Sequence, residues 1–251
     1  MKSLLSLLAL SLFACSAPPQ NENTGTSFNQ ATLQAIATMP LGGGYSGTDA
    51  TKNKLPLACK VAENGEHGFF FNPKAAQPSF CSGASYLVFL SALQMMSPPT
   101  TTQAKARVVG FDQKDGHGTF GRWNANGPGC AKLVADLKCG ENFTSWERAQ
   151  PGDFLKIWWN EHIGGRERGH HVVYLGHDQN TLRYWSSNLP DGYGEKSIPR
   201  TNCKRVLFTR ITSPRKINQA FQLPASDPWL ERMLRDDFSW EEVRRKCRVQ
   251  D

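Results

Sequence analysis

One apolar segment, PSFCSGASYLVFLSALQ at residues 78–94, constrains the fold of this chain more than any other feature. Its leading Pro-Ser pair is typical of a helix start, and Pro98-Pro99 ends the helix. Residues 86–93 are apolar nearly all round a helix, which is the pattern of a helix buried on every side. We therefore predict a central, buried helix whose first turn carries Cys81.

Short runs typical of strands follow this helix. They cover residues 154–159, 170–175, 182–187 and 204–211, and turn-forming residues precede the first three. One buried helix followed by sequential short strands predicts an α+β domain with an antiparallel sheet, which we place at residues 59–214. The composition, with 39% hydrophobic and 20% charged residues, is that of a globular protein and excludes wholesale disorder, collagen and coiled coil.

A helical C-terminal extension is predicted after this domain, at residues 215–251. Asp227-Pro228 has the form of an N-cap followed by proline at the first helical position. The sequence SWEE from Ser239 is a capping-box pattern that opens a second, basic helix. We expect this extension to pack on the main domain, with its basic residues on a solvated helix face.

The N-terminal residues 1–14, MKSLLSLLALSLFA, have the pattern of a secretory signal peptide, and their apolar run is too short for a permanent membrane span. The sequence LFAC that ends at Cys15 resembles a bacterial lipobox, in which Cys15 becomes the lipidated first residue. An ordinary signal peptide that ends near a cysteine is the alternative. We predict that residues 15–58 form a lipid-anchor tether and a turn-rich segment. The protein would then be anchored in the bacterial cell envelope, facing the periplasm or the cell exterior.

The chain has seven cysteines, and an exported protein is able to hold disulfides. If Cys15 is lipidated, the other six allow three bridges, whereas a catalytic thiol among them leaves at least one cysteine unpaired. Cys130 and Cys139 are close in sequence and are the favoured pair. The sequence does not determine any pairing.

The formal net charge of +7 favours anionic partners such as nucleic acid, anionic lipid or cell-wall polymers, but charge alone does not choose among them. An exported chain without a known recognition motif argues against nucleic acid. Four histidines have spacings that match no familiar zinc pattern: His162, His170, His171 and His177. We therefore expect no metal site and no nucleic-acid partner.

Cys81 is the candidate nucleophile. A thiol attacks as the thiolate, and the free N–H groups and positive dipole end at a helix N-terminus lower the pKa of a cysteine placed there. The same N–H groups can hold a developing oxyanion, and the small residues Ser82 and Gly83 leave room for a substrate backbone. The alternative is a buried structural cysteine or one half of a disulfide.

A histidine suits the role of the base that accepts the thiol proton near neutral pH. His170 and His171 adjoin at the start of the second predicted strand, where they face opposite sides. Only one of them is able to meet Cys81, and alternation alone does not decide between the two. A third polar group must hold the imidazole in its orientation.

Three motifs occur in order along the chain: FCSG at residues 80–83 before the apolar helix, PGDFL at residues 151–155 entering a strand, and HHVVYLG at residues 170–176. Together they resemble the nucleophile, turn and histidine motifs of NlpC-like cell-wall peptidases, which are papain-like cysteine hydrolases. The resemblance implies an NlpC-type, papain-like fold. It places the base at His170, counted back from the Tyr-Leu-Gly ending. It places the third polar residue on the following strand, where Ser187 is our first choice and Asn188 our second.

The resemblance also implies an enzyme that cleaves amide bonds in the stem peptides of peptidoglycan, in keeping with the secretion signal. Cys81 would attack the carbonyl, and its backbone N–H would help to hold the oxyanion. His170 would act first as base and then as acid. The chemistry needs no metal or organic cofactor, and we expect a monomer.

Three departures from the family pattern define the alternative function. The family usually has Asp where this chain has Phe80, and its third residue is often His. An insertion at about residues 97–150 lengthens the chain between Cys81 and His170. The first two departures are what we expect of a catalytically inactive, lipid-anchored module that binds cell-wall polymer or a protein.

Overall fold

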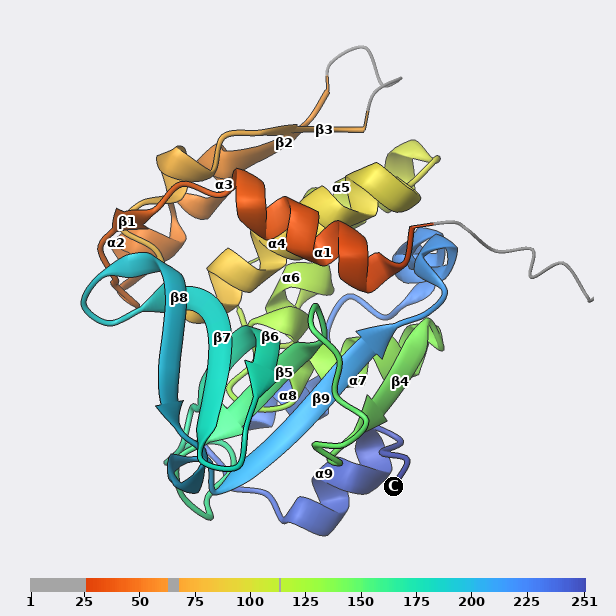
Figure 1. The fold of residues 1–251 in the computed structure, drawn as a ribbon. Coiled ribbons are helices and arrows are strands. Elements are labelled where there is room, and N and C mark those ends of the chain that lie inside the picture. The colour runs from red at the N-terminus through yellow and green to blue at the C-terminus, as the bar shows by residue number, and fades with distance from the viewer. Residues whose placement is uncertain (1–25, 63–67, 113) are drawn as a thin grey trace, which may run out of the picture.

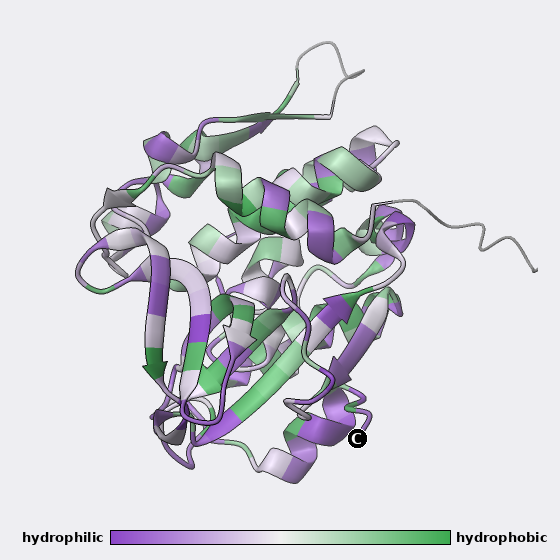
Figure 2. Cartoon of the chain, in the orientation of Figure 1, coloured by the Kyte–Doolittle hydropathy of each residue, from purple (hydrophilic) through white to green (hydrophobic). Residues whose placement is uncertain are grey.

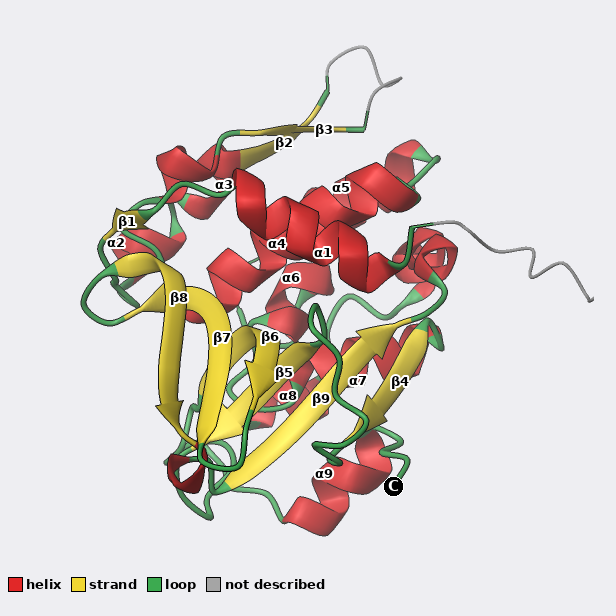
Figure 3. Cartoon of the chain, viewed as in Figure 1, coloured by secondary structure: helices red, strands yellow, loops and turns green. Residues whose placement is uncertain are grey.

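The computed structural model describes residues 26–62, 68–112 and 114–251 (Figure 1). The predicted signal peptide and the lipidation site at Cys15 lie outside these residues. Within them the chain has an α+β fold, in which helices pack against a large, mostly antiparallel sheet (Figure 3). The α+β class predicted from the sequence is therefore confirmed.

Seven strands of the described chain form this sheet, in the order β1-β8-β7-β6-β5-β9-β4. Their bounds are Gly42–Gly43 (β1), Gly140–Phe143 (β4), Phe154–Trp158 (β5), His170–His177 (β6), Thr181–Asn188 (β7), Gly192–Pro199 (β8) and Arg205–Ile211 (β9). Neighbouring strands pair antiparallel throughout. The four predicted strands correspond to β5, β6, β7 and β9, and β1, β4 and β8 complete the sheet. A separate two-stranded sheet pairs β2 (Cys59–Val61) with β3 (Phe69–Phe71).

The central helix is α4 (Cys81–Met96), which packs on β6 and β7 and on the helices α1 (Phe28–Thr38) and α6 (Gly118–Trp123). Every residue from Gly83 to Leu90 is buried, as predicted from the all-round apolar pattern. The helix begins later than its Pro-Ser pair suggested, because Phe80 has an extended backbone (φ −134°, ψ 161°) and is the N-cap. Cys81 is therefore the first helical residue.

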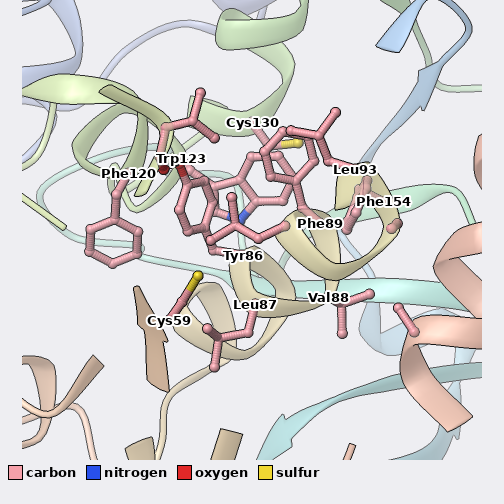
Figure 4. Close-up of a cluster of buried hydrophobic side chains, with 14 of the residues drawn as sticks. Cys59, Tyr86, Leu87, Val88, Phe89, Leu93, Phe120, Trp123, Cys130 and Phe154 are labelled. Atoms are coloured by element: carbon pink, nitrogen blue, oxygen red, sulfur yellow. Dashed lines mark hydrogen bonds between the residues drawn. The ribbon is translucent and has the colours of Figure 1, made fainter. Parts of the chain in front are cut away.

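An aromatic cluster holds α4 against the sheet and the insertion (Figure 4). The ring of Trp123 lies 4.8 Å, between centroids, both from Phe89 of α4 and from Phe154 of β5. Tyr86 packs on the same tryptophan at 5.5 Å. Burial of each such side chain contributes about 1.5–3 kcal/mol. This packing positions the N-terminus of α4 relative to the strands that carry the candidate histidines.

The N-terminal residues 28–58 belong to the same core, which corrects the domain boundary placed at residue 59. Phe28 and Ala31 of α1 are buried against α4. Leu55 of α3 (Leu55–Ala58) joins them. The amphipathic pattern in this region is short, and its burial depends on a helix distant in sequence, so local patterning could not place it inside the domain.

The insertion at residues 97–150 combines helices with an edge strand. It contains α5 (Thr102–Val109), α6, α7 (Gly129–Leu137) and the edge strand β4. The short helical segments elsewhere are α2 (Asp49–Lys52), η1 (Pro73–Ala76), η2 (Arg200–Asn202) and η3 (Pro214–Gln222). Cys130 and Cys139, the favoured pair for a disulfide, are free thiols, as are the other described cysteines.

The C-terminal extension packs on the sheet as expected. Asp227 caps α8 (Pro228–Arg232) and Ser239 caps α9 (Trp240–Lys246), each with its side chain, as their sequence patterns predicted. Leu230 and Met233 are fully buried in a cluster with Trp158 of β5. Figure 2 shows that α9 is mostly hydrophilic, in agreement with a solvated basic face.

Candidate active site

Cys81 lies at an uncapped helix N-terminus. Its predecessor Phe80 makes no side-chain hydrogen bond to the first turn of α4, so the side chain of the N-cap does not occupy the N–H groups of that turn. The ring of Phe80 instead packs over Gly83, where a Cβ atom would lie only 2.8 Å from the ring Cζ. Gly83 therefore allows Phe80 to fold inward, and the residue Cys81 remains partly exposed at the helix start.

The thiol of Cys81 is strongly acidic for a cysteine. Burial opposes its ionisation, but a hydrogen bond with the His170 side chain and the positive charges of His170 and Lys156 outweigh that effect. The backbone N–H of His171 also donates to the sulfur. Together these groups lower the pKa of Cys81 to about 6, so most of the thiol is ionised at neutral pH.

His170 begins β6 and is held by Asn188, the last residue of β7. The Nε2 atom of His170 lies 3.3 Å from the Oδ1 atom of Asn188. The Nδ2 atom of Asn188 donates to the carbonyl oxygens of Ser186 and Gly194, at 3.3 and 2.9 Å, so its Oδ1 must face the imidazole. Nε2 therefore carries the proton that Oδ1 accepts, and Nδ1 is left for the sulfur of Cys81.

The structure places Asn188, the second choice from the sequence, beside His170 and corrects the first choice, Ser187. Successive residues of β7 face opposite sides of the sheet. Asn188 lies on the side of His170, whereas the buried Oγ of Ser187 has no hydrogen-bond partner in the described chain. The sequence identified the strand that carries this residue, but the first choice, Ser187, lies one position before Asn188.

His171 faces the opposite side of β6, toward α4. Its Nδ1 lies 2.5 Å from the Oγ of Ser85, which also accepts a hydrogen bond from the indole N–H of Trp123 at 3.1 Å. Burial, together with the charges of Lys156 and His170, holds the pKa of His171 well below its usual range. His171 is thus a neutral core residue that helps to align α4 with β6.

Tyr45 is a site residue that sequence reasoning missed. Residues 44–46 run beside Ser79, with hydrogen bonds from Ser79 N to Gly44 O (3.1 Å) and from Ser46 N to Ser79 O (2.8 Å). This pairing brings the Tyr45 hydroxyl within hydrogen-bonding reach of Cys81, and the negative charge of the thiolate, with burial, raises the pKa of Tyr45. The tyrosine therefore stays protonated as a donor. A phenol donor beside the sulfur has no local sequence signal.

A cleft of about 140 Å³ opens beside Cys81. The insertion supplies Asp115 and Asn124 to its wall, and the C-terminal extension supplies Leu234. Ser82 donates to the Oδ1 of Asn124 at 2.5 Å, and the Nδ2 of Asn124 donates to Asp115 at 3.0 Å. Burial raises the pKa of Asp115 to about 7 despite nearby cations. The two segments outside the region of resemblance therefore shape the space next to the nucleophile.

The described chain contains no cluster of three or more His, Cys, Asp or Glu side chains suited to hold a metal ion. None of its described helices has the length and apolar character that a membrane crossing requires. Comparisons with family models, curated proteins and solved structures found no match. The functional argument therefore rests on the chemistry of the site, which unites an acidic thiol, an oriented imidazole and a phenol donor.

Proposed function

We propose that this protein is an exported cysteine hydrolase with a papain-like, NlpC-type catalytic domain, which cleaves amide bonds in peptidoglycan stem peptides. One observation carries the proposal: the side chains of Cys81, His170 and Asn188 form a connected series from nucleophile to base to orienting group. A buried structural cysteine has no need of such a partner. The stem-peptide substrate rests on the sequence resemblance and on the secretion signal.

The proposed reaction starts with the Cys81 thiolate attacking the amide carbonyl carbon. The carbonyl oxygen becomes an oxyanion, which the Cys81 backbone N–H and the Tyr45 hydroxyl are placed to stabilise. The imidazolium of His170 gives its proton to the leaving amine, which departs and leaves a thioester on Cys81. His170 then takes a proton from water, whose oxygen attacks the thioester and releases the acid product with the thiolate restored.

Digestion of purified wall fragments tests this function. The wild-type protein should release peptide fragments whose masses correspond to one added water per cleaved amide bond, and Cys81→Ala should release none. The matched control is Cys203→Ala, because Cys203 is also partly exposed but lies outside the cleft, and burial raises its pKa to about 11. Equal digestion by wild type and Cys81→Ala would refute the proposal.

The second candidate is a module on the same fold that binds cell-wall polymer or a protein without cleaving it. This candidate is motivated by Phe80, which stands at the position that usually holds Asp in the family. Binding of insoluble wall by both wild type and Cys81→Ala, with no soluble product from either, would support this module. The lipid anchor at Cys15 and the envelope location belong to either candidate and remain part of the proposal.

A further inference from the structure

Lys156 is a buried lysine whose only role in the proposed mechanism is the effect of its positive charge on the Cys81 thiolate. It lies on β5 between Phe154 and Trp158, which point to the same side of the strand and are both buried. That alternation predicts a third apolar side chain at position 156. The chain instead places an ammonium group there, with the residue only 7% exposed. Burying a charge costs free energy unless the charge has a partner or a function.

The fixed contacts of Lys156 do not include an anion. Its Nζ donates to the backbone carbonyl oxygen of Arg168 at 2.6 Å. No ion pair within 4.0 Å in the described part of the chain involves Lys156. The negative charges of Cys81, Asp115 and Glu167 act on Lys156 only through space. The Glu167 carboxylate accepts its hydrogen bonds from Asn160 and from the backbone of Gly169 instead.

Lys156 lines the same cleft as Cys81, directly across the strand pair from His171. Lys52 and Arg168 also line this cleft, so three basic side chains face one carboxylate, that of Asp115. Lys52 is already paired with Asp49 at 3.3 Å, and Arg168 is exposed to solvent. Lys156 is therefore a buried basic group of the cleft that has no ion-pair partner within 4.0 Å in the described chain.

We propose that Lys156 makes the cleft beside Cys81 a subsite for an anionic group, so that the enzyme prefers substrates with a carboxylate next to the scissile amide bond. The inference rests on the proposed function for its substrate, but the charge preference is a property of the cleft itself. A carboxylate that enters this cleft replaces the missing partner of Lys156. The burial of Lys156 away from solvent strengthens that attraction.

Alkylation of Cys81 by two reagents of similar size tests the charge preference. Iodoacetate carries a carboxylate and iodoacetamide is neutral, and both transfer their methylene carbon to the thiolate with loss of iodide. Because both require the same thiolate, the ratio of their rates does not depend on the fraction of Cys81 that is ionised. At pH 8, the iodoacetate to iodoacetamide ratio should fall about tenfold in Lys156→Gln, as expected for the loss of one nearby charge.

Two further variants separate charge from packing. Lys156→Arg keeps the charge and should keep most of the wild-type ratio. Lys216→Met is the matched control, because Lys216 also donates to a backbone carbonyl, that of Lys138 at 2.8 Å, but lies outside the cleft. Its ratio should equal that of wild type. Thermal unfolding of each variant verifies that the fold is retained, and Lys156→Met supplies a second neutral variant if Lys156→Gln is unstable.

A substrate pair completes the test. Wild type should cleave a stem peptide with a free carboxylate next to the scissile bond at a higher kcat/KM than the same peptide with that carboxylate amidated, and Lys156→Gln should cleave both alike. An unchanged alkylation ratio in Lys156→Gln would overturn the inference and leave the hydrolase proposal standing. A reduced ratio in a protein that hydrolyses neither peptide would support the anionic subsite and refute the hydrolase instead.

Discussion

Replacing His170 by alanine should change the acidity of Cys81 more than any other substitution at the site. The imidazole supplies both a hydrogen bond and a positive charge to the thiolate, and these are the two largest effects that lower the pKa of Cys81. Burial, which raises this pKa, remains in the variant. We therefore expect the pKa of Cys81 in His170→Ala to rise at least to the value of a free thiol, about 8.5.

The size of the effect follows from the fraction of thiolate. With the pKa of about 6 in the wild-type protein, roughly nine-tenths of Cys81 is ionised at pH 7. With a pKa of about 8.5 the ionised fraction at pH 7 is roughly 3%. The rate of alkylation by neutral iodoacetamide at pH 7 should therefore fall about 30-fold. At pH 10 the two proteins should react at similar rates, because both thiols are then ionised.

The assay measures the rate of iodoacetamide labelling between pH 5 and pH 10, with the labelled peptide identified by mass. Cys81 should dominate below pH 8, because burial raises the pKa of the other described cysteines. The matched control is His177→Ala, since His177 ends the same strand and contacts Tyr174 rather than Cys81. Its profile should match that of wild type. A wild-type inflection above pH 8, or an equal inflection in His170→Ala, would refute the reasoning.

Three further substitutions test other parts of the site. Asn188→Ala should slow wall-peptide hydrolysis by about 10- to 100-fold, because the imidazole loses its orienting acceptor. Ser187→Ala should leave the rate within about twofold. Equal losses in the two variants would contradict the assignment of Asn188 as the residue that orients His170. Tyr45→Phe should lower kcat by about tenfold or more with little change in thermal stability, and an unchanged kcat would remove Tyr45 from the mechanism. Asp115→Asn should stabilise the protein against urea at pH 8 by about 2 kcal/mol but not at pH 4. The folded-state pKa of about 7 lies above the ordinary value of 3.8, so stability is lost as pH rises from about 4 to about 7 and the full cost is present at pH 8. A lost hydrogen bond offsets part of the gain in the variant. Equal effects at the two pH values would contradict that pKa.

Local patterns in the sequence were sufficient to predict the helices and strands at the centre of the molecule. The all-round apolar run predicted the burial of α4, and cap residues such as Asp227 and Ser239 predicted the two helices of the extension. These signals succeed because a helix start and a helix face depend on residues a few positions apart. The β4 and β8 strands carry polar and glycine residues, GENF and GYGEKSIP, and therefore lack the apolar pattern used to identify strands.

The sequence predicted only those parts of the site that depend on a single helix or strand. Cys81 and the strand of His170 follow from local motifs, but the partner of His170 depends on the register between β6 and β7. That register includes an irregularity between Tyr174 and Gly176, and a shift of one residue exchanges the two faces of a strand. Choosing Ser187 instead of Asn188 is an error of this kind. Tyr45 and Asp115 reach the cleft from segments whose approach only the tertiary fold determines.

Phe80 stands where the NlpC-like family that this chain resembles usually has Asp. This difference is compatible with an active nucleophile on physical grounds. An Asp at the N-cap would accept hydrogen bonds from the first-turn N–H groups of α4 and would add a negative charge next to Cys81. Both effects would oppose a thiolate and an oxyanion at that position. Phe80 leaves those N–H groups without a side-chain acceptor and packs its ring against Phe120 and Gly83 instead. The departure from the family pattern thus removes a competing anion, while His170 and Lys156 supply the positive charge that the thiolate needs.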